Sequence, residues 1–205
     1  MLRFGLDFSF ALSDISVMTE ITDRNDVASG KLPPALERFV LQWGDMGSTW
    51  GVNRSVSQIH ALLYVSGRPM TAEEIAGTLG IARSNVSTSI RELMGWDLIR
   101  RVPIKGDRRE HFEAEGEIWE IVSRIAAGRK AREFDPAIAA LRACVAEANR
   151  DASVDRRASQ RVKDMLAFTE MVDTWYGQMR TVPRDKLAML MKLGARIIKL
   201  LPGRK

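Results

Sequence analysis

The chain has 205 residues, of which 45% are hydrophobic and 28% charged, and its formal net charge is +5 at pH 7. This composition supports a sizeable core and excludes disorder over most of the chain, and the mild basic excess suits a polyanionic partner. A single cysteine, Cys144, excludes an internal disulfide and a multi-cysteine zinc site. No stretch has the length and apolar purity of a membrane span, so the sequence predicts a cytoplasmic protein.

Residues 1–32 are predicted to be a leader, in part disordered. Apolar residues alternate strictly from Leu2 to Leu12, which is a strand pattern. Asp7 interrupts that run, so it is not a secretory signal. Residues 14–31 are polar and rich in Gly, Ser and Asp. We expect a winged helix-turn-helix domain with flanking helices over 33–132 and a C-terminal helical dimerisation region over 133–205.

Two amphipathic helices precede the winged unit. The first is predicted over 35–50, with Leu36, Phe39 and Trp43 on its apolar side. The second ends at Gly67 and contains Ile59 and His60, and Ser55 or Ser57 is the expected N-cap. His60 lies among apolar residues, so we expect a core or interface histidine with its hydrogen bonds satisfied.

Residues 69–113 have the order of elements of a winged helix-turn-helix. Thr71 and Glu74 have the spacing of a capping box that opens a short helix. Gly80 permits a tight turn, and a second helix is predicted over 83–96. Two short strands, over 98–102 and 109–112, then flank a charged loop with Gly106 at its tip. The predicted fold class is mainly α with a small β-hairpin wing.

The helix over 83–96 has one apolar and one polar side. Val86, Ile90, Leu93 and Met94 recur at helical spacing and should face the core. Small hydroxyl and amide side chains, with arginines, project from the other sides. Such a face suits the major groove of DNA, which is about 12 Å wide, because small side chains let the backbone approach phosphates and base edges. An ordinary solvated helix face is the alternative.

The hairpin supports the same interpretation. Its basic residues surround one acidic residue, Asp107, which we interpret as an internal partner that orients an arginine. A cationic tip of this kind can enter the minor groove. A charged, solvated turn is the alternative. The predicted DNA-contact residues of the helix and the wing together are Arg83, Ser84, Asn85, Ser87, Thr88, Arg91, Lys105, Arg108 and Arg109.

The remainder is predicted to be helical. Helices are expected from Glu115 to about Arg132 and from an Asp135-Pro136 cap to about Asn149, followed by a polar connection over 150–161. An apolar stripe from Val162 to Met179 is close to a heptad pattern, and a last amphipathic helix begins at Pro183 and reaches Leu201. We expect these two stripes to pair two chains, because a single winged domain cannot cover them. The basic outer side of the last helix offers membrane binding as the alternative.

The segment from about Leu36 to Ile121 resembles the MarR superfamily of winged-helix regulators, and within it the GbsR-type branch. The resemblance rests on FVLQWGDMGSTWG at 39–51, SNVSTSIRELMGWDLIRRV at 84–102 and KGDRREHFEAEGEIWEI at 105–121. The family's Asp-x-Arg wing pattern falls on Asp107 and Arg109. The resemblance implies a homodimeric, DNA-binding transcriptional regulator. Beyond Arg124 no specific motif is present.

Enzyme activity has little support in this sequence. His60 and His111 are far apart and neither lies in a catalytic motif, and the sequence has no phosphate loop, nucleophile elbow or dinucleotide fingerprint. We therefore predict that the chain is not an enzyme, and we predict no metal and no cofactor.

A small-molecule effector is a further possibility, because aromatic residues flank the winged unit. The resemblance implies it too, since GbsR-like proteins include sensors of quaternary ammonium compounds such as choline, which aromatic faces bind. Ordinary helix packing by these aromatics is the alternative. The predicted ligand residues are Trp43, Trp50, Tyr64, Trp175 and Tyr176.

The sequence thus predicts a homodimeric regulator, a repressor, that binds double-stranded DNA at an inverted repeat. Two rivals remain open. A winged-helix module that binds protein would need an apolar exposed face on the second helix of the winged unit. A sensor with weak DNA affinity would be separated from a constitutive repressor by titration with effectors.

Overall fold

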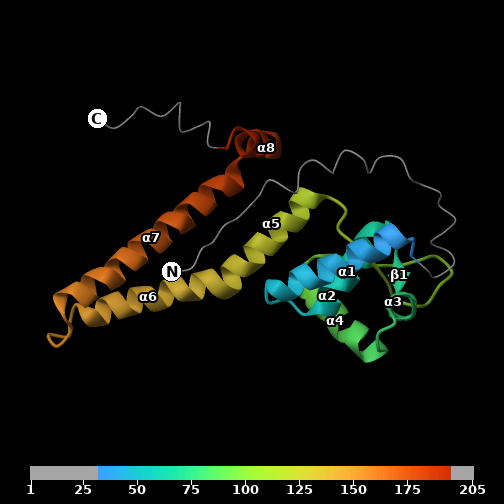
Figure 1. The fold of residues 1–205 in the computed structure, drawn as a ribbon, viewed down its shortest axis with the longest axis horizontal. Coiled ribbons are helices and arrows are strands. Elements are labelled where there is room, and N and C mark those ends of the chain that lie inside the picture. The colour runs from blue at the N-terminus through green and yellow to red at the C-terminus, as the bar shows by residue number, and fades with distance from the viewer. Residues whose placement is uncertain (1–31, 195–205) are drawn as a thin grey trace. The chain divides into compact units, whose positions relative to one another are not determined.

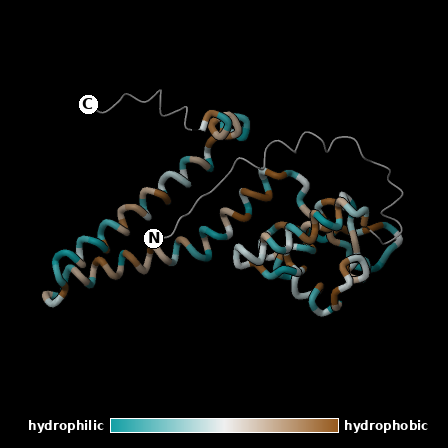
Figure 2. Tube along the Cα trace, in the orientation of Figure 1, coloured by the Kyte–Doolittle hydropathy of each residue, from teal (hydrophilic) through white to brown (hydrophobic). Residues whose placement is uncertain are grey.

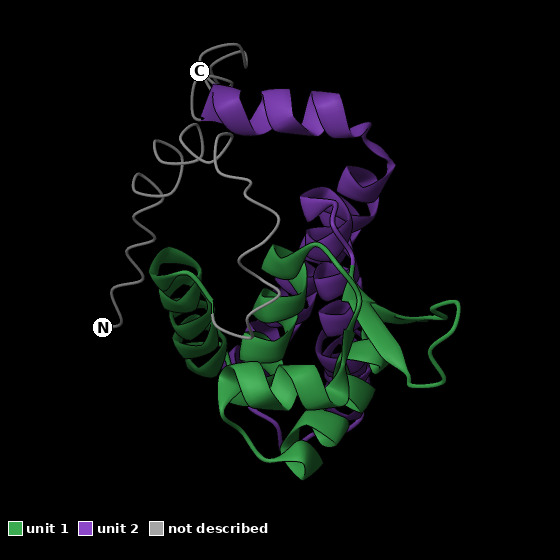
Figure 3. Cartoon of the chain, turned by 90° about the vertical axis from the view of Figure 1, so that its right-hand side faces the viewer, with its two compact units in different colours: residues 1–114 green, residues 115–205 purple. Residues whose placement is uncertain are grey.

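The computed structural model describes residues 32–194. It is mostly helical with one small antiparallel sheet, as predicted (Figure 1). The chain divides into two compact units, residues 1–114 and 115–205 (Figure 3). The predicted leader and residues 195–201 of the predicted last helix lie outside the described residues. The elements are α1 Pro34–Thr49, α2 Arg54–Ser66, β1 Met70–Thr71, α3 Ala72–Leu79, α4 Arg83–Gly95, β2 Ile99–Val102, β3 His111–Ala114, α5 Ile118–Arg129, a π-helical turn Lys130–Phe134, α6 Asp135–Ala148, α7 Arg156–Thr181 and α8 Arg184–Leu193.

Helices α1 and α2 pack closely as a hairpin. Gly44 and Gly47 are buried on α1, and a Cβ atom at Gly47 would lie 2.7 Å from the Cβ of Ser57 on α2. The two glycines therefore allow the helix backbones to approach. The expected caps of α2 were wrong: Asn53 caps the helix by accepting a 2.9 Å hydrogen bond from the backbone N–H of Ser55. Asn53 lies outside the helix with its side chain turned back over the first turn, which is the N-cap geometry.

The helix-turn-helix forms as predicted. Thr71 Oγ1 accepts a hydrogen bond from the backbone N–H of Glu74, and the Glu74 carboxylate accepts one from the backbone N–H of Thr71, which completes the capping box. Gly80 ends α3 with φ +63°, a left-handed conformation that disfavours a side chain. Helix α4 then begins at Arg83, where the sequence placed it.

The wing differs in register from the prediction. The sheet has the order β1-β3-β2, with Val102 opposite His111 and Met70 opposite Phe112. The second wing strand thus begins at His111 rather than at Arg109. The reason is local: the Asp107 carboxylate accepts a hydrogen bond from the backbone N–H of Arg109, so this N–H closes the turn instead of joining the ladder. Strand β1 has two residues, too few to produce an alternating pattern.

The core of the first unit is formed mainly by side chains of α2, α3 and α4. Its largest fully buried side chains include Ile59, Leu62 and Leu63 of α2, with Ile75 and Leu93. His60 lies among them with 4% of its surface exposed, and its Nε2 has no hydrogen-bond partner among the described residues. The prediction of a core histidine is confirmed, but the expectation that its hydrogen bonds are satisfied was wrong. Burial lowers the pKa of His60 to about 4, because desolvation disfavours the charged imidazolium.

In the second unit the predicted break between two helices is absent. Asp135 does not act as a cap; it has helical backbone angles, and its N–H bonds the carbonyl of Lys130 five residues earlier. Helix α5 continues through this π-helical turn into α6. Pro136, at the start of α6, has no N–H to donate, and a π turn is one way a helix accommodates such a lost bond. The continuous helix spans residue 132, where the sequence predicts the end of the winged domain, and the two compact units divide at residue 114.

Helix α7 packs against α6 through the stripe that was predicted to pair two chains. Thr169 is buried, Val172 and Tyr176 are half-buried, and Arg142 of α6 donates a 2.8 Å hydrogen bond to Glu170. Figure 2 shows apolar and polar positions alternating along both helices. A second, exposed set of apolar residues remains on α7, which we call the α7 stripe. It consists of Met165, Phe168, Met171 and Trp175.

Candidate nucleic-acid interface

Helix α4 presents a polar side to solvent. Val86, Ile90 and Leu93 are buried, as the helical spacing predicted. Arg83, Ser84, Ser87, Thr88 and Arg91 are exposed. Five of the predicted contact residues therefore lie on one accessible helix in the geometry that a groove-binding helix needs.

Asn85 lies apart from that exposed side. Its Nδ2 donates a 2.8 Å hydrogen bond to Ser55 Oγ at the start of α2, and the pair is partly buried. This bond ties α4 to α2, so the amide is engaged within the protein. The sequence could not show this, because the two residues are thirty positions apart.

Arg91 is held only by weak local contacts. Its Nε donates to the carbonyl of Ser87 at 3.4 Å, and its Nη2 donates to Thr88 Oγ1 at 3.3 Å. Both distances are at the long end for hydrogen bonds. Within residues 32–194 no ion pair joins Arg91 to a carboxylate. Its guanidinium is thus available to an outside acceptor.

The wing tip is built around Asp107. Gly106 has φ +86°, and the Asp107 carboxylate accepts from both Nε and Nη2 of Arg109, at 3.0 and 2.5 Å. This fork of hydrogen bonds and the positive charge of Arg109 hold the pKa of Asp107 well below its usual range. The prediction that Asp107 orients an arginine is confirmed. The same pairing means that Arg109 is not free, whereas Lys105 and Arg108 are exposed at the tip.

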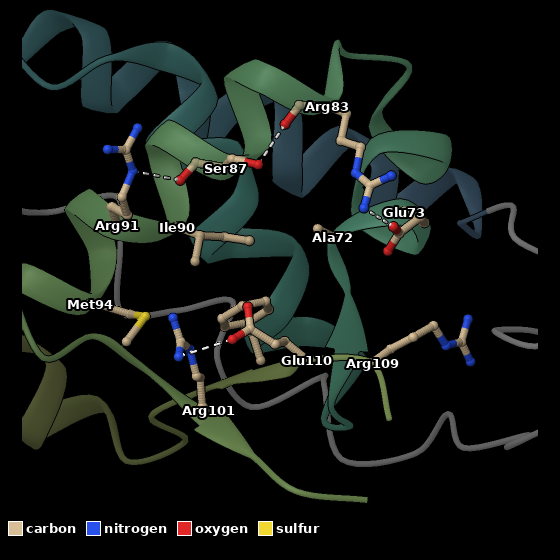
Figure 4. A pocket seen from close by; sticks show the side chains of 11 residues that line it. Ala72, Glu73, Arg83, Ser87, Ile90, Arg91, Met94, Arg101, Arg109 and Glu110 are labelled. Carbon is tan, nitrogen blue, oxygen red and sulfur yellow. Dashed lines mark hydrogen bonds and ion pairs between the residues drawn. The ribbon is translucent and has the colours of Figure 1, made fainter. Parts of the chain in front are cut away.

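A groove of about 370 Å³ lies between α3–α4 and the wing strands (Figure 4). Ile90, Met94 and Phe112 form its apolar part. Two aspects of this groove were not predicted from the sequence. Arg101 lines the groove, and acidic partners lie beside its arginines. Pairing of Arg83 with Glu73 and of Arg101 with Glu110 follows from the tertiary fold alone.

The five aromatic residues predicted to bind a ligand do not converge within either unit. In the first unit Trp43 packs against Phe39 with ring centroids 5.6 Å apart, Trp50 follows α1 and is 63% exposed, and Tyr64 lies near the end of α2. Because α1 and α2 are antiparallel neighbours, Trp50 and Tyr64 lie at opposite ends of the hairpin. In the second unit Trp175 belongs to the exposed α7 stripe.

Tyr176, by contrast, lines a cleft. This cleft of about 390 Å³ lies among α5, α7 and α8, with Trp119, Met179 and Leu187 also in its wall. Arg184 at the start of α8 pairs with Glu117, the N-cap of α5, and with Glu120 of α5, which fixes one side of the cleft. Of the predicted ligand residues, only Tyr176 reaches this space.

The described residues show neither a membrane-spanning helix nor a metal site. No helix within 32–194 is both long and apolar enough to cross a membrane. In the same part of the chain, no three His, Cys, Asp or Glu side chains lie close enough to hold a metal ion.

Comparison with known proteins gives one family-model match, which lies over the winged unit. The MarR family model matches residues 50–110. Two Bacillus subtilis proteins match over 86 residues, or 42% of this chain: the putative HTH-type transcriptional regulator YvaV at 22% identity and the HTH-type transcriptional repressor OpcR at 25% identity. The match spans about half the length of these relatives, 49% and 46%.

A crystal structure of a transcriptional regulator has the same fold. It matches with a TM-score of 0.53 and 24% identity over 73% of this chain and all of that chain. The matched proteins are transcriptional regulators rather than enzymes, which agrees with the prediction from the sequence. Residues 50–110, which contain the helix-turn-helix and most of the wing, are thus similar to the MarR family model.

Proposed function

We propose that this chain is a transcriptional repressor of the GbsR-like branch that binds an inverted repeat in double-stranded DNA as a homodimer. The observation that supports this most directly is the exposed polar side of α4 beside an open groove and a basic wing. In a dimer, two copies of α4 would enter successive major grooves, roughly 34–36 Å apart. Ser84, Ser87, Thr88 and Arg91 would face base edges and phosphates.

The wing would add contacts from outside the major groove. Arg108 and Lys105 are exposed at the tip, and Arg109 is oriented by Asp107. Arg108 and Arg109 would follow the adjacent minor groove, and Lys105 would contact the backbone. Asn85 and Arg83 would support the helix from its flank and its N-terminus, where free N–H groups attract phosphate.

The homodimer is supported by exposed apolar surface on the second unit. Phe168 and Trp175 of the α7 stripe are 59% and 58% exposed. Apolar surface of this kind on a helix favours association, and a symmetric pair matches a palindromic site. The α7 stripe replaces the Val162–Met179 stripe as the candidate interface, because the latter packs against α6.

The test is selection of bound duplexes from a random-sequence library by the full chain, followed by footprinting near its own gene. Enrichment of one inverted repeat supports the proposal. Enrichment of no sequence, with salt-insensitive binding, would contradict it. A winged module that binds protein would need exposed apolar residues on α4, whereas its exposed residues are polar.

A second candidate function is effector sensing, which the cleft at Tyr176 favours. We infer a role for this cleft because Trp119 and Tyr176 line it, and aromatic walls can hold an organic cation. Titration of the full chain with choline, followed by tryptophan fluorescence and by DNA affinity, tests it. A fluorescence change that Tyr176→Ala removes supports the role; an unchanged spectrum and affinity contradict it.

A further inference from the structure

The arginines that line the groove beside α4 are of two kinds. Among the described residues, Arg91 donates to the Ser87 carbonyl and the Thr88 hydroxyl, at 3.3–3.4 Å, and to no carboxylate. The others are each paired with a carboxylate: Arg83 with Glu73, Arg101 with Glu110 at 2.9 Å, and Arg109 with Asp107. Much of the positive charge on this surface is therefore neutralised within the protein.

The pairs of Arg83 and Arg101 each join two different elements on one side of the groove. Glu73 lies in the first turn of α3, and Arg83 lies in the first turn of α4. Arg101 belongs to β2, and Glu110 directly precedes β3. Figure 4 shows the guanidinium groups of Arg83 and Arg101 directed at these carboxylates, while Arg109 extends away from Glu110.

Within residues 32–194, neither glutamate side chain has a second hydrogen bond or ion pair. The capping box of α3 uses Glu74, not Glu73. Strand β3 begins after Glu110, so the ladder does not depend on its side chain. Both carboxylates instead lie on the surface that DNA would approach, where an unpaired carboxylate would repel phosphate.

We propose that Glu73 and Glu110 are intramolecular competitors of DNA phosphate that limit the affinity of the groove. This inference rests on the proposed DNA-binding function. In the free protein each glutamate occupies one guanidinium, and a phosphate must displace it before Arg83 or Arg101 can contribute. The arrangement weakens binding to DNA of any sequence, which keeps the protein from being retained on non-operator DNA.

The exposure of the pairs makes such an exchange feasible. The side chains of Arg83 and Glu73 are 70% and 46% exposed, and those of Arg101 and Glu110 are 58% and 59% exposed. Exposed ion pairs are weak because water and salt screen them. A phosphate of DNA, with its high charge density, can compete with a partner of this kind.

The experiment measures binding of the full chain to a fluorescent duplex of random sequence, at several salt concentrations. We expect Glu73→Gln and Glu110→Gln each to raise the affinity about two- to fivefold, which is the range of an exposed ion pair. The log–log slope against salt should steepen by up to about 0.9 for each arginine released.

Two controls separate this mechanism from a change in net charge. Glu37→Gln alters the net charge equally but lies in the first turn of α1, so it should leave the affinity unchanged. In an Arg83→Ala background, the gain from Glu73→Gln should shrink, because only the direct repulsion between the carboxylate and phosphate is then relieved. Equal gains for all three glutamates, or an undiminished gain without Arg83, would overturn the inference.

The outcomes also distinguish this inference from the proposed function. If the unaltered chain binds duplex DNA and neither glutamate variant changes that affinity, only the inference fails. If the unaltered chain does not bind DNA at low salt, the proposed function fails and the inference fails with it. Far-UV circular dichroism of each variant verifies the fold, and Glu110, which lies outside any helix or strand, provides a variant independent of α3.

Discussion

Arg91 is the residue of α4 whose replacement bears most directly on base recognition. Its guanidinium is exposed, and within the described residues no carboxylate competes for it. We expect Arg91→Ala to weaken binding to the selected duplex by about 1–3 kcal/mol relative to a scrambled duplex, if the side chain reads a base edge. Competition binding on the two duplexes measures this difference. Arg38→Ala removes the same charge from an exposed position on α1 and is the control. An equal loss of affinity on both duplexes would show that Arg91 contacts phosphate rather than a base.

His60 makes the stability of the first unit depend on pH. Its pKa falls from 6.5 to about 4 on folding, so between these values the unfolded chain binds more protons than the folded chain. The contribution of His60 to the free energy of unfolding is therefore fully present above pH 6.5. It is lost as the pH falls towards 4, by roughly 3 kcal/mol in total.

Denaturant midpoints across this interval measure the effect. We expect His60→Leu to remove most of the decrease between pH 6.5 and about 4, because the variant has no imidazole to protonate. Other groups contribute equally to both proteins, so the difference between the two curves isolates His60. Parallel curves would contradict the assignment.

At the scale of elements, the close approach of α1 and α2 depends on Gly47. A Cβ there would lie within 2.7 Å of Ser57 Cβ, an atom fixed to the backbone of α2. We expect Gly47→Ala to lower the free energy of unfolding by about 1–3 kcal/mol, since the helices must separate. Gly77 of α3 has no atom within 4 Å of the same position, so Gly77→Ala should instead stabilise by about 0.5–1 kcal/mol. Chemical denaturation of both variants compares them, and similar values would show that the helices adjust freely.

The helix-turn-helix was predictable from the sequence, whereas the start of the second wing strand was not. The capping box at Thr71 and the turn at Gly80 depend only on neighbouring residues, so local sequence patterns reveal them. The start of β3 depended on a hydrogen bond from the backbone of Arg109 to Asp107, which competes with strand pairing. A local pattern of apolar residues cannot show whether the backbone of Arg109 bonds to Asp107 or joins the strand.

At the scale of the whole molecule, the proposed dimer can be tested on the α7 stripe. We expect Phe168→Lys with Trp175→Lys to convert a dimer to a monomer, because two lysines would have to be buried in the interface. Ala167→Lys with Thr174→Lys adds the same charge to exposed positions outside the stripe and should remain dimeric. Light scattering of the full chain gives the mass of each. A monomeric unaltered protein, or dissociation of both variants, would place the interface elsewhere.

Loss of the dimer should also weaken DNA binding. Each winged unit would then bind its half-site without the effective concentration that its partner provides. The affinity of the Phe168→Lys, Trp175→Lys variant for the selected inverted repeat should fall towards that for a single half-site. Equal affinities of variant and unaltered chain would separate dimerisation from recognition.

The sequence by itself determined the helix-turn-helix, the buried side of α4 and the polar side that faces solvent. Caps, turns and helical periodicity act between residues a few positions apart, so Val86, Ile90 and Leu93 were assignable to the core without a structure. Only the tertiary structure decided which apolar stripe of α7 meets α6, which aromatic residue reaches a cleft, and which arginines of the groove are already paired. Those outcomes depend on contacts between residues distant in the chain, such as Asn85 with Ser55 and Arg142 with Glu170, and several partners of similar chemistry compete for each.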